Sequence, residues 1–346
     1  MKSLSIITNE RIYFNRNNNK FYAENVDCKT IIDGLKKNFR ISLFARYSKE
    51  KKDNLINIKK VLICKNFIYY FLNNFFLKKK IKSDYNLIIS ITPFTFLAFI
   101  LMHFVFSVNF FLYLRSDGFK EYEIILGKKY VFIYSLMYRI MCKRSKVISC
   151  HESLYKEKNV NLIYPSELTQ SWFSTVNNRN INKLKFLYVG RFKIEKGTIY
   201  ILNFFKKKSM QNYSLTLVGE GDIYNAKLSS NIKIYSYIKN INKLINIYDD
   251  HNIFILPSYT EAHPKVIDEA LSRFLPIIIF DDIKHIIENR KGIFSCKRNM
   301  SSFLKTVKYI QKNYNNITKQ MKYNKLPTKD KFIKDLHKII IAKNFI

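Results

Sequence analysis

Short apolar segments alternate with helix-like segments along most of this chain, and the alternation restricts the folds that it can adopt. It is typical of βαβ units, whose strands pair in parallel sheets covered by helices. The second half is predicted to contain strands at 185–189, 214–218, 232–235, 253–256 and 276–280, with helices near 196–207, 241–249, 266–274 and 300–313. We therefore expect an α/β protein.

The first half shows the same alternation. It is predicted to contain strands at 4–7, 41–44, 87–91, 110–114 and 147–149, with helices near 29–37, 58–77, 96–106 and 130–141. A chain of 346 residues can form two domains with substantial cores, and the polar stretch 177–182 suggests a linker. We expect one domain at 1–175, a second at 176–330, and a terminal amphipathic helix at 331–346 that packs back on the first.

Residues 86–114 contain no Asp, Glu, Lys or Arg, and a membrane span needs about 20 apolar residues. A second interpretation divides the segment into a strand, a helix and another strand, because buried parallel strands read as continuous apolar runs. Thr92 and Pro93 suit the start of that helix. The polar residues within the segment favour the second interpretation.

The composition is strongly basic, with 60 Lys and Arg against 26 Asp and Glu and a net charge of +34. Such a charge attracts polyanions, either nucleic acid or an anionic membrane face. Compositional bias is the alternative origin of the charge, but attraction to anionic lipid follows in either case. No RNA-binding aromatic motif, zinc finger or helix-turn-helix is recognisable. We therefore expect a membrane surface as a partner and no nucleic acid.

The five cysteines are scattered, and none forms a C-x-x-C pair. This pattern offers no disulfide framework or zinc knuckle and fits a reducing compartment. The N-terminal segment is too short in apolar length for a secretory signal. No cluster of His, Cys and Asp has the spacing of metal ligands. We expect a cytoplasmic location and no metal site.

Two cations follow the predicted strand 185–189. Gly190 ends the strand, and Arg191 and Lys196 come directly after it. Open α/β sheets bind their ligands where strands end and helices begin, and a guanidinium with an ammonium suits a diphosphate. The alternative is that both are solvated surface cations, which applies to Lys196 more than to Arg191.

Two carboxylates follow the predicted strand 253–256. Glu261 is expected in a loop with free backbone amides, and Glu269 within the next helix. Helix-start amides bind phosphate, and carboxylates accept hydrogen bonds from sugar hydroxyls. Two glutamates at this spacing are common by chance, but not directly after an apolar strand. The pair therefore points to a nucleotide-sugar site.

Three other places carry polar groups. The turn Gly219-Glu220-Gly221 either approaches a nucleotide through its backbone or only reverses the chain. Asp117 follows the strand 110–114 and is a candidate for orienting an acceptor hydroxyl. A local ion pair with Arg115, or an Asx turn before Gly118, is the alternative. His151 is expected to be structural or capping.

These motifs resemble those of glycosyltransferase family 4, retaining enzymes with the GT-B fold. The matching segments, in the family's order, are Val189-Gly190-Arg191 with Glu195-Lys196-Gly197, Leu217-Val218-Gly219-Glu220-Gly221, and Leu256-Pro257-Ser258 with Glu261, Glu269 and Leu275-Pro276. Ala262, Phe274 and Ser236 stand where the family usually has glycine. A Gly-Gly loop near the N-terminus is replaced by Asn9-Glu10-Arg11.

The resemblance implies two doubly wound, Rossmann-like parallel-sheet domains that face a central cleft. It implies that Gly190, Arg191 and Lys196 bind the donor diphosphate and that Glu269 binds the ribose. Glu261 and Asp117 are the implied catalytic residues, on the donor and acceptor sides. The donor-sugar side also includes Ala262, His263, Lys265 and Val266. The implied co-substrate is a nucleoside-diphosphate sugar, with no cofactor and no metal.

Two functions remain open. The first is a hexosyltransferase-type enzyme that moves a sugar with retention onto a growing cell-surface glycan, of the polysaccharide, lipopolysaccharide or capsule kind, or onto a lipid-linked acceptor. It would act as a peripheral protein at the inner face of the plasma membrane. The alternative is a catalytically inactive, basic GT-B-like protein that binds membrane lipid or nucleic acid.

Overall fold

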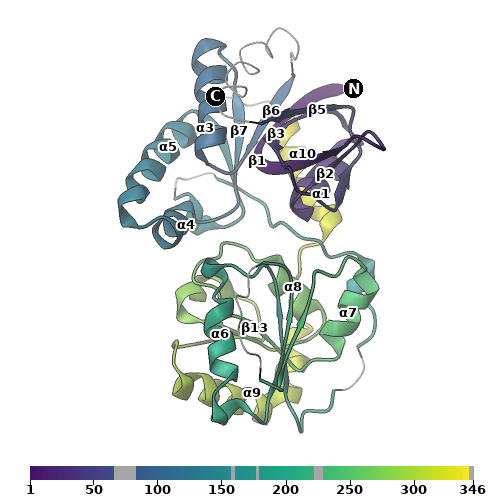
Figure 1. Cartoon of the computed structure of the whole chain (residues 1–346), viewed down its shortest axis with the longest axis vertical. Coiled ribbons are helices and arrows are strands. Elements are labelled where there is room, and N and C mark those ends of the chain that lie inside the picture. Colours follow the sequence, from purple (N-terminus) through teal and green to yellow (C-terminus); the bar gives the residue numbers. More distant parts are fainter. Residues whose placement is uncertain (66–82, 157–159, 177–178, 222–228, 343–346) are drawn as a thin grey trace. The chain divides into compact units, whose positions relative to one another are not determined.

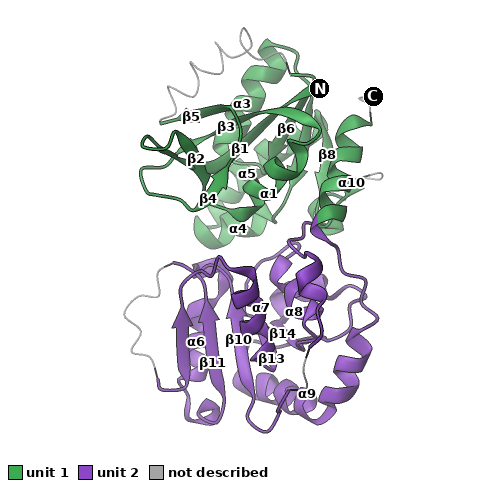
Figure 2. Ribbon diagram, turned by 90° about the vertical axis from the view of Figure 1, so that its right-hand side faces the viewer, with its two compact units in different colours: residues 1–164, 330–346 green, residues 165–329 purple. Residues whose placement is uncertain are grey.

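The computed structural model describes residues 1–65, 83–156, 160–176, 179–221 and 229–342. The chain forms two compact units, Met1–Tyr164 with Asp330–Ile346 (unit 1) and Pro165–Lys329 (unit 2) (Figure 2). The boundary lies before Pro165 and not at the predicted 175–176. The reason is that Leu168 and Trp172 are buried in the hydrophobic core of unit 2.

Unit 2 contains a parallel sheet in the order β12-β11-β10-β13-β14-β15. The strands are β10 (Lys185–Val189), β11 (Ser214–Val218), β12 (Ile232–Tyr235), β13 (Ile253–Leu256), β14 (Ile277–Phe280) and β15 (Ile293–Cys296). β11 and β13 flank β10 on opposite sides, so the direction in which strands are added reverses at β10. In open α/β sheets such a reversal marks the ligand site, at the carboxyl ends of the strands.

Helices lie on both sides of this sheet (Figure 1). They are α6 (Thr198–Phe205), α7 (Ile241–Asp249), α8 (Lys265–Ser272) and α9 (Met300–Met321). α9 continues past its predicted end at 313 because the buried side chains Tyr314, Ile317 and Met321 extend its apolar face. β15 was not predicted. Short 3₁₀ helices of the two units lie at Lys128–Tyr130, Glu152–Leu154, Gln170–Phe173, Ile194–Lys196, Lys208–Met210 and Asp281–Ile287.

α8 ends in a left-handed turn at Phe274, whose φ is 53°. The backbone N–H groups of Phe274 and Leu275 donate to the carbonyls of Leu271 and Ala270, each at 3.0 Å. This is the Schellman arrangement, in which glycine is favoured because it has no Cβ to clash. Phe274 therefore occupies a position at which the backbone itself prefers glycine.

Arg273 is a fully buried cation that joins three segments of unit 2. Its Nε and Nη2 donate to the two carboxylate oxygens of Asp249 at 2.9 and 2.7 Å, and its Nη1 donates to the carbonyl oxygens of Trp172 and Ser174, both at 2.9 Å. The pairing satisfies a charge that would otherwise be costly to bury. It also fixes the first segment of unit 2 against α7 and the end of α8.

The sheet of unit 1 is mixed. β5, β3, β1, β6, β7, β8 and β9 pair in parallel, and β2 and β4 extend it antiparallel from the second half of β1. The strands are β1 (Lys2–Asn15), β2 (Lys20–Ala23), β3 (Phe39–Tyr47), β4 (Asn54–Ile56), β5 (Lys60–Cys64), β6 (Tyr85–Ile89), β7 (Phe110–Leu114), β8 (Ser145–Ser149) and β9 (Asn161–Leu162).

The helices of unit 1 are α1 (Val26–Leu35), α3 (Pro93–Ile100), the π-helix η1 (Leu101–Val105), α4 (Gly118–Ile125), α5 (Val131–Lys143) and α10 (Lys329–Ile341). α10 buries Phe332, Leu336 and Ile340, and the Phe332 ring lies 6.5 Å from that of Tyr113 on β7. The predicted helix at 58–77 is wrong at its start, since Lys60–Cys64 pair with β3 as a strand. From residue 66 that prediction lies outside the described residues.

The uncharged segment 86–114 forms β6, α3, η1 and β7. Thr92 caps α3 by accepting a hydrogen bond from the Thr95 N–H, and Pro93 occupies the first turn. β6 and β7 pair in the middle of the sheet, so burial in the core accounts for the apolar character of these two strands. Within the part of the chain that the structure describes, no helix combines the length and the apolar content needed to cross a bilayer.

Candidate functional site

The loops after β10 and β13 meet at the carboxyl edge of the unit 2 sheet. The strands pair in parallel, with Phe186 opposite Ile253, so both loops leave the sheet at the same edge. The Tyr259 N–H donates to the Glu195 carbonyl at 2.9 Å. Gly197 has φ of 64°, and a Cβ there would lie 2.1 Å from the Pro257 carbonyl oxygen. The two loops therefore touch through their backbones.

This contact brings together two of the predicted site residues. Lys196 Nζ lies 2.6 Å from Glu261 Oε1, and Ser258 Oγ donates to the same oxygen at 2.7 Å. The side chains of Lys196 and Glu261 are 19% and 11% exposed. Both side chains are therefore largely buried but still partly accessible to solvent.

Arg191 lies at the tip of β10, in the same loop as Lys196. Its side chain is exposed, and its carbonyl accepts a hydrogen bond of 2.9 Å from the buried Tyr188 hydroxyl. Burial raises the pKa of the Tyr188 hydroxyl, and the negative charge of the nearby Glu261 raises it further. Tyr188 thus stays neutral, and its hydroxyl anchors the loop through the Arg191 carbonyl.

The turn Gly219-Glu220-Gly221 packs against the Arg191 loop. The Phe192 N–H donates to the Glu220 carbonyl at 2.7 Å. A Cβ on Gly219 would lie 1.9 Å from the Gly190 carbonyl oxygen. The glycines therefore serve the close approach of two backbone segments, and a contact of this turn with a nucleotide stays a prediction.

Arg298 fixes the loop that carries Glu261, and no motif in the sequence pointed to this residue. Its Nη1 and Nη2 donate to the carbonyls of Pro257 and Ser258 at 3.0 and 2.9 Å, and its Nε pairs with Asp282 at 2.8 Å. The guanidinium also lies 4.0 Å from the ring centroid of Tyr259. Because Ser258 in turn binds Glu261, Arg298 positions that carboxylate indirectly.

Glu269 lies within α8 and is 8% exposed. The Tyr248 hydroxyl donates to its Oε2 at 2.7 Å. Burial raises the pKa of Glu269 to about 7, although the bond from Tyr248 and the charge of Lys265 act in the opposite direction. Tyr248 is a further residue that sequence reasoning missed. Glu269 can therefore bind a hydroxyl either as a donor or as an acceptor near neutral pH.

The segment between the two glutamates is largely buried. Ala262 is buried and Val266 packs against the core. His263 Nε2 lies 2.8 Å from Asp268, which also pairs with Arg290 at 3.0 Å. His263 is thus held in a structural network of α8, and a contact with the donor sugar stays a prediction.

Lys265 belongs to a bridge around Glu167. Its Nζ lies 2.9 Å from Glu167 Oε1, and Lys329 Nζ lies 3.1 Å from Oε2. Ser166 Oγ donates to the Pro327 carbonyl at 2.7 Å, and the Lys329 N–H donates to the Leu168 carbonyl at 2.9 Å. The two ends of unit 2 are therefore tied together next to Lys265.

Asp117, the predicted acceptor-side residue, lies in unit 1. Its Oδ1 accepts a hydrogen bond of 3.2 Å from the Lys120 N–H and caps α4. The alternative pairing of Arg115 with Asp117 is not what the structure shows, because Arg115 pairs with Asp27 at the start of α1. His151 caps the 3₁₀ helix Glu152–Leu154 through its Nδ1, which confirms the expected capping role.

Lys196 and Glu261 are in direct contact, and Arg191 extends from the same loop as Lys196. Glu269 lies farther along α8, in its own contact with Tyr248. Among the residues that the structure describes, no group of three or more His, Cys, Asp or Glu side chains is placed to hold a metal ion.

Comparison with known families matches residues 173–326 to the family described as glycosyl transferases group 1. An uncharacterized glycosyltransferase of Methanocaldococcus jannaschii is 27% identical over 51% of this chain and 48% of its own. An amylovoran biosynthesis glycosyltransferase of Erwinia amylovora is 25% identical over 47% of this chain and 48% of its own. The chain thus spans about half the length of these curated relatives.

The solved structure of a sucrose-phosphate synthase from Thermosynechococcus elongatus superposes with a TM-score of 0.69 at 13% identity, covering 98% of this chain and 95% of its own. At this identity the likeness establishes the fold. The chain has the GT-B fold, two Rossmann-like α/β domains built on parallel-sheet cores, as the sequence predicted.

Proposed function

We propose that this protein is a hexosyltransferase of family 4 that moves a sugar, with retention, from a nucleoside-diphosphate sugar to a cell-surface glycan or a lipid-linked acceptor. The observation that carries the proposal is the contact between Lys196 and Glu261 at the switch point of the unit 2 sheet. A cation and an acid brought together at this edge suit a ligand that carries both phosphates and hydroxyls.

In the proposed reaction the bond from the anomeric carbon to the diphosphate oxygen breaks, and the diphosphate keeps the electron pair. The acceptor hydroxyl oxygen bonds to the same face of the sugar, and its proton passes to the leaving diphosphate. Arg191 and Lys196 neutralise the charge that grows on that diphosphate, as fixed cations do in other transfer reactions. No metal takes part in this proposal.

The remaining roles are those that the family resemblance implies, and the contacts of each side chain support them. Glu261, held by Lys196 and Ser258, binds the donor sugar. Glu269, oriented by Tyr248, binds the ribose hydroxyls. Asp117 orients the acceptor hydroxyl through Oδ2, since its Oδ1 caps α4. Arg298 acts through the backbone of the 257–258 loop and is a positioning residue.

The acceptor class rests on a relative and on charge. The curated name of the Erwinia amylovora relative refers to amylovoran biosynthesis. A net charge of +34 favours the anionic inner face of a membrane. We therefore place the protein in the cytoplasm as a peripheral enzyme that extends a polysaccharide or lipid-linked glycan.

The proposal is tested first by thermal stabilisation with UDP, GDP, ADP and CMP sugars. At a ligand concentration of about 100 times Kd, stability should rise by about 2.7 kcal/mol. One nucleotide should stand out from the others. If none of them shifts the melting temperature while a polyanion does, the inactive basic binding protein becomes the better description.

Transfer itself is tested with Arg191→Ala and Glu261→Ala. Both should lose transfer of radiolabelled sugar to a membrane-derived acceptor while keeping a cooperative unfolding transition. Normal turnover by both variants would refute the assignment of the site.

A further inference from the structure

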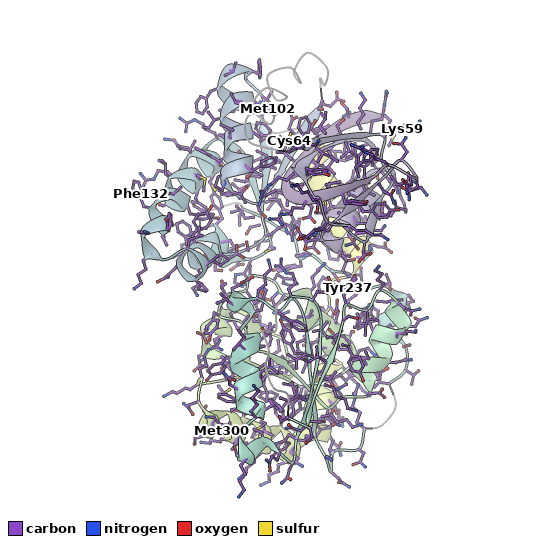
Figure 3. All side chains as sticks on the ribbon, viewed as in Figure 1. Lys59, Cys64, Met102, Phe132, Tyr237 and Met300 are labelled. Carbon is purple, nitrogen blue, oxygen red and sulfur yellow. The ribbon has the colours of Figure 1, made fainter. Side chains whose placement is uncertain are left out.

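Helices α4 and α5 of unit 1 carry an exposed apolar surface. They lie on one flank of the unit (Figure 1). The surface consists of six large side chains, with exposed fractions of 37–75%, which we call the α4–α5 surface: Ile125, Leu126, Tyr130, Phe132, Ile133 and Leu136. Figure 3 shows Phe132 at the outer edge of α5. Single exposed apolar residues are ordinary, but six of them within residues 125–136 indicate an interaction site.

The helical spacing shows that this exposure is systematic. One face of α5 buries Tyr134, Met137 and Met141 against unit 1. The opposite face presents Phe132 and Leu136, which are 75% and 48% exposed. The first half of this outer face is apolar, and its second half carries the exposed Arg139 and Lys143, so the apolar half resembles a helix face that normally packs against a partner. In water, Phe132 and Leu136 on the outer face of α5 are therefore exposed to solvent and not packed against an apolar surface.

Cations surround the α4–α5 surface. Residues 124–151 contain no Asp or Glu, whereas they contain Lys128, Lys129, Arg139, Lys143, Arg144 and Lys146. Lys128, Lys129, Arg139 and Lys143 are exposed, and Lys129 lies 5.0 Å from the Tyr130 ring centroid. Two acids lie on α4: Glu123, at 3.8 Å from Lys128, and Glu121, whose Oε2 accepts a hydrogen bond of 3.1 Å from Ser116 Oγ.

The surface continues beyond the end of α5. Arg144 stacks on Phe104 of η1, with 5.2 Å between the guanidinium and the ring centroid. Phe104 and Val105 are 53% and 55% exposed. An aromatic ring, an aliphatic side chain and a cation thus recur at the far end of the helix.

We propose that the α4–α5 surface inserts into the anionic face of a lipid bilayer. Apolar and aromatic side chains on a helix flanked by Lys and Arg are the pattern of a helix that lies in the membrane interface. A protein partner fits less well, because lysine is depleted in protein–protein interfaces. The inference deepens the membrane association of the proposed function by naming its surface, and it uses no residue of the donor site.

The test is flotation of the full chain with vesicles of phosphatidylcholine alone or mixed with phosphatidylglycerol. The protein should float with the mixed vesicles and release as salt rises. Phe132→Glu/Leu136→Glu should abolish flotation at any salt concentration. Lys128→Glu/Lys129→Glu should weaken it on the order of 1,000-fold at low salt, since the two reversals together change four units of charge near the surface.

Matched control variants come from unit 2. Tyr309→Glu/Tyr323→Glu places the same two charges at positions that are 54% and 79% exposed, and Lys305→Glu/Lys308→Glu reverses two exposed lysines. If these controls lose binding as much as the α4–α5 variants, or if Phe132→Glu/Leu136→Glu floats normally, the proposal is wrong. A dimer that Phe132→Glu/Leu136→Glu converts to a monomer would also overturn it, in favour of a second copy.

Nucleotide-sugar stabilisation of the same variants separates this inference from the proposed function. Phe132→Glu/Leu136→Glu should still be stabilised by the nucleotide sugar but should no longer bind the vesicles. Vesicle binding at the α4–α5 surface in a protein that no nucleotide sugar stabilises would support the surface and count against the transferase.

Discussion

Lys196 Nζ and Glu261 Oε1 lie 2.6 Å apart although 65 positions separate the two residues in the chain. They meet because β10 and β13 are neighbours in a parallel sheet, which brings the loops after both strands to one edge. A diphosphate that arrives at this edge meets an ammonium whose position a carboxylate has already set. Such preorganisation reduces the cost of ordering the site during the reaction.

We predict that Lys196→Ala lowers kcat/KM for transfer by a factor on the order of 100 or more, because a fixed cation at the leaving group is lost. Glu261→Gln should have an effect of similar size, and the double variant should lose less than the product of the two. The measurement is steady-state transfer with purified acceptor.

Lys193→Ala is the matched control, since Lys193 is exposed in the same loop. It should retain nearly full activity. Equal losses for Lys193→Ala and Lys196→Ala would mean that only the overall charge of the loop matters.

The raised pKa of Glu269 predicts a pH-dependent stability. The folded state keeps its proton up to about pH 7, whereas the carboxyl ordinarily titrates near 4.5. Between these values the folded state holds more protons than the unfolded state, so this group's contribution to stability falls as the pH rises. Glu269→Gln, which mimics the protonated acid, should gain about 2 kcal/mol relative to the wild type between pH 5 and pH 8.

Urea unfolding of both proteins at the two pH values measures this gain. The exposed Glu152 provides the control variant Glu152→Gln. A constant difference between Glu269→Gln and the wild type across this range would show that the carboxyl is not buried as the structure places it.

Phe274 adopts a left-handed backbone conformation that favours glycine. Phe274→Ala and Phe274→Gly both remove the aromatic ring, but only glycine also relieves the backbone. We predict that Phe274→Gly is more stable than Phe274→Ala by about 1 kcal/mol. Chemical denaturation of the two variants gives this difference directly. A more stable Phe274→Ala variant would contradict the left-handed conformation at residue 274.

Asp249 is the carboxylate partner of the buried Arg273. Asp249→Ala would leave that guanidinium without its counter-charge, so we predict a loss of about 3 kcal/mol in the free energy of unfolding. Asp250→Ala, at the exposed position that directly follows α7, should change stability little. Thermal or urea unfolding measures the free energy of unfolding of both variants. Similar losses in the two would show that the Asp249–Arg273 pair does not stabilise unit 2.

Sequence reasoning predicted unit 2 better than unit 1. The strands 185–189, 214–218, 232–235 and 253–256 are confirmed at their exact bounds, because each is a continuous apolar run between turn residues. At Lys60–Cys64 the same reasoning predicted a helix, since periodicity does not distinguish a short buried strand from a helix. α4 was missed because the polar residues before it read as a turn.

For the candidate site, the position of charged residues after strands was enough to predict that Lys196 and Glu261 approach one another. Their supporting contacts could not be predicted. Arg298 and Tyr248 reach the site from 40 and 21 positions away in the chain, and nothing local in their segments signals it. The roles given to Arg191, Glu269 and Asp117 remain predictions.

The bridge at Glu167 has a practical consequence for the design of fragments of this protein. Glu167, near the start of unit 2, forms an ion pair with Lys329 at its end. A fragment that spans 165–329 therefore contains both partners of this ion pair. A fragment that begins at 176 would lack this ion pair and the segment that contains Trp172. The part of the core that Trp172 covers would then be exposed to water. We therefore expect unit 2 to be more stable as a fragment of residues 165–329 than as one that begins at residue 176.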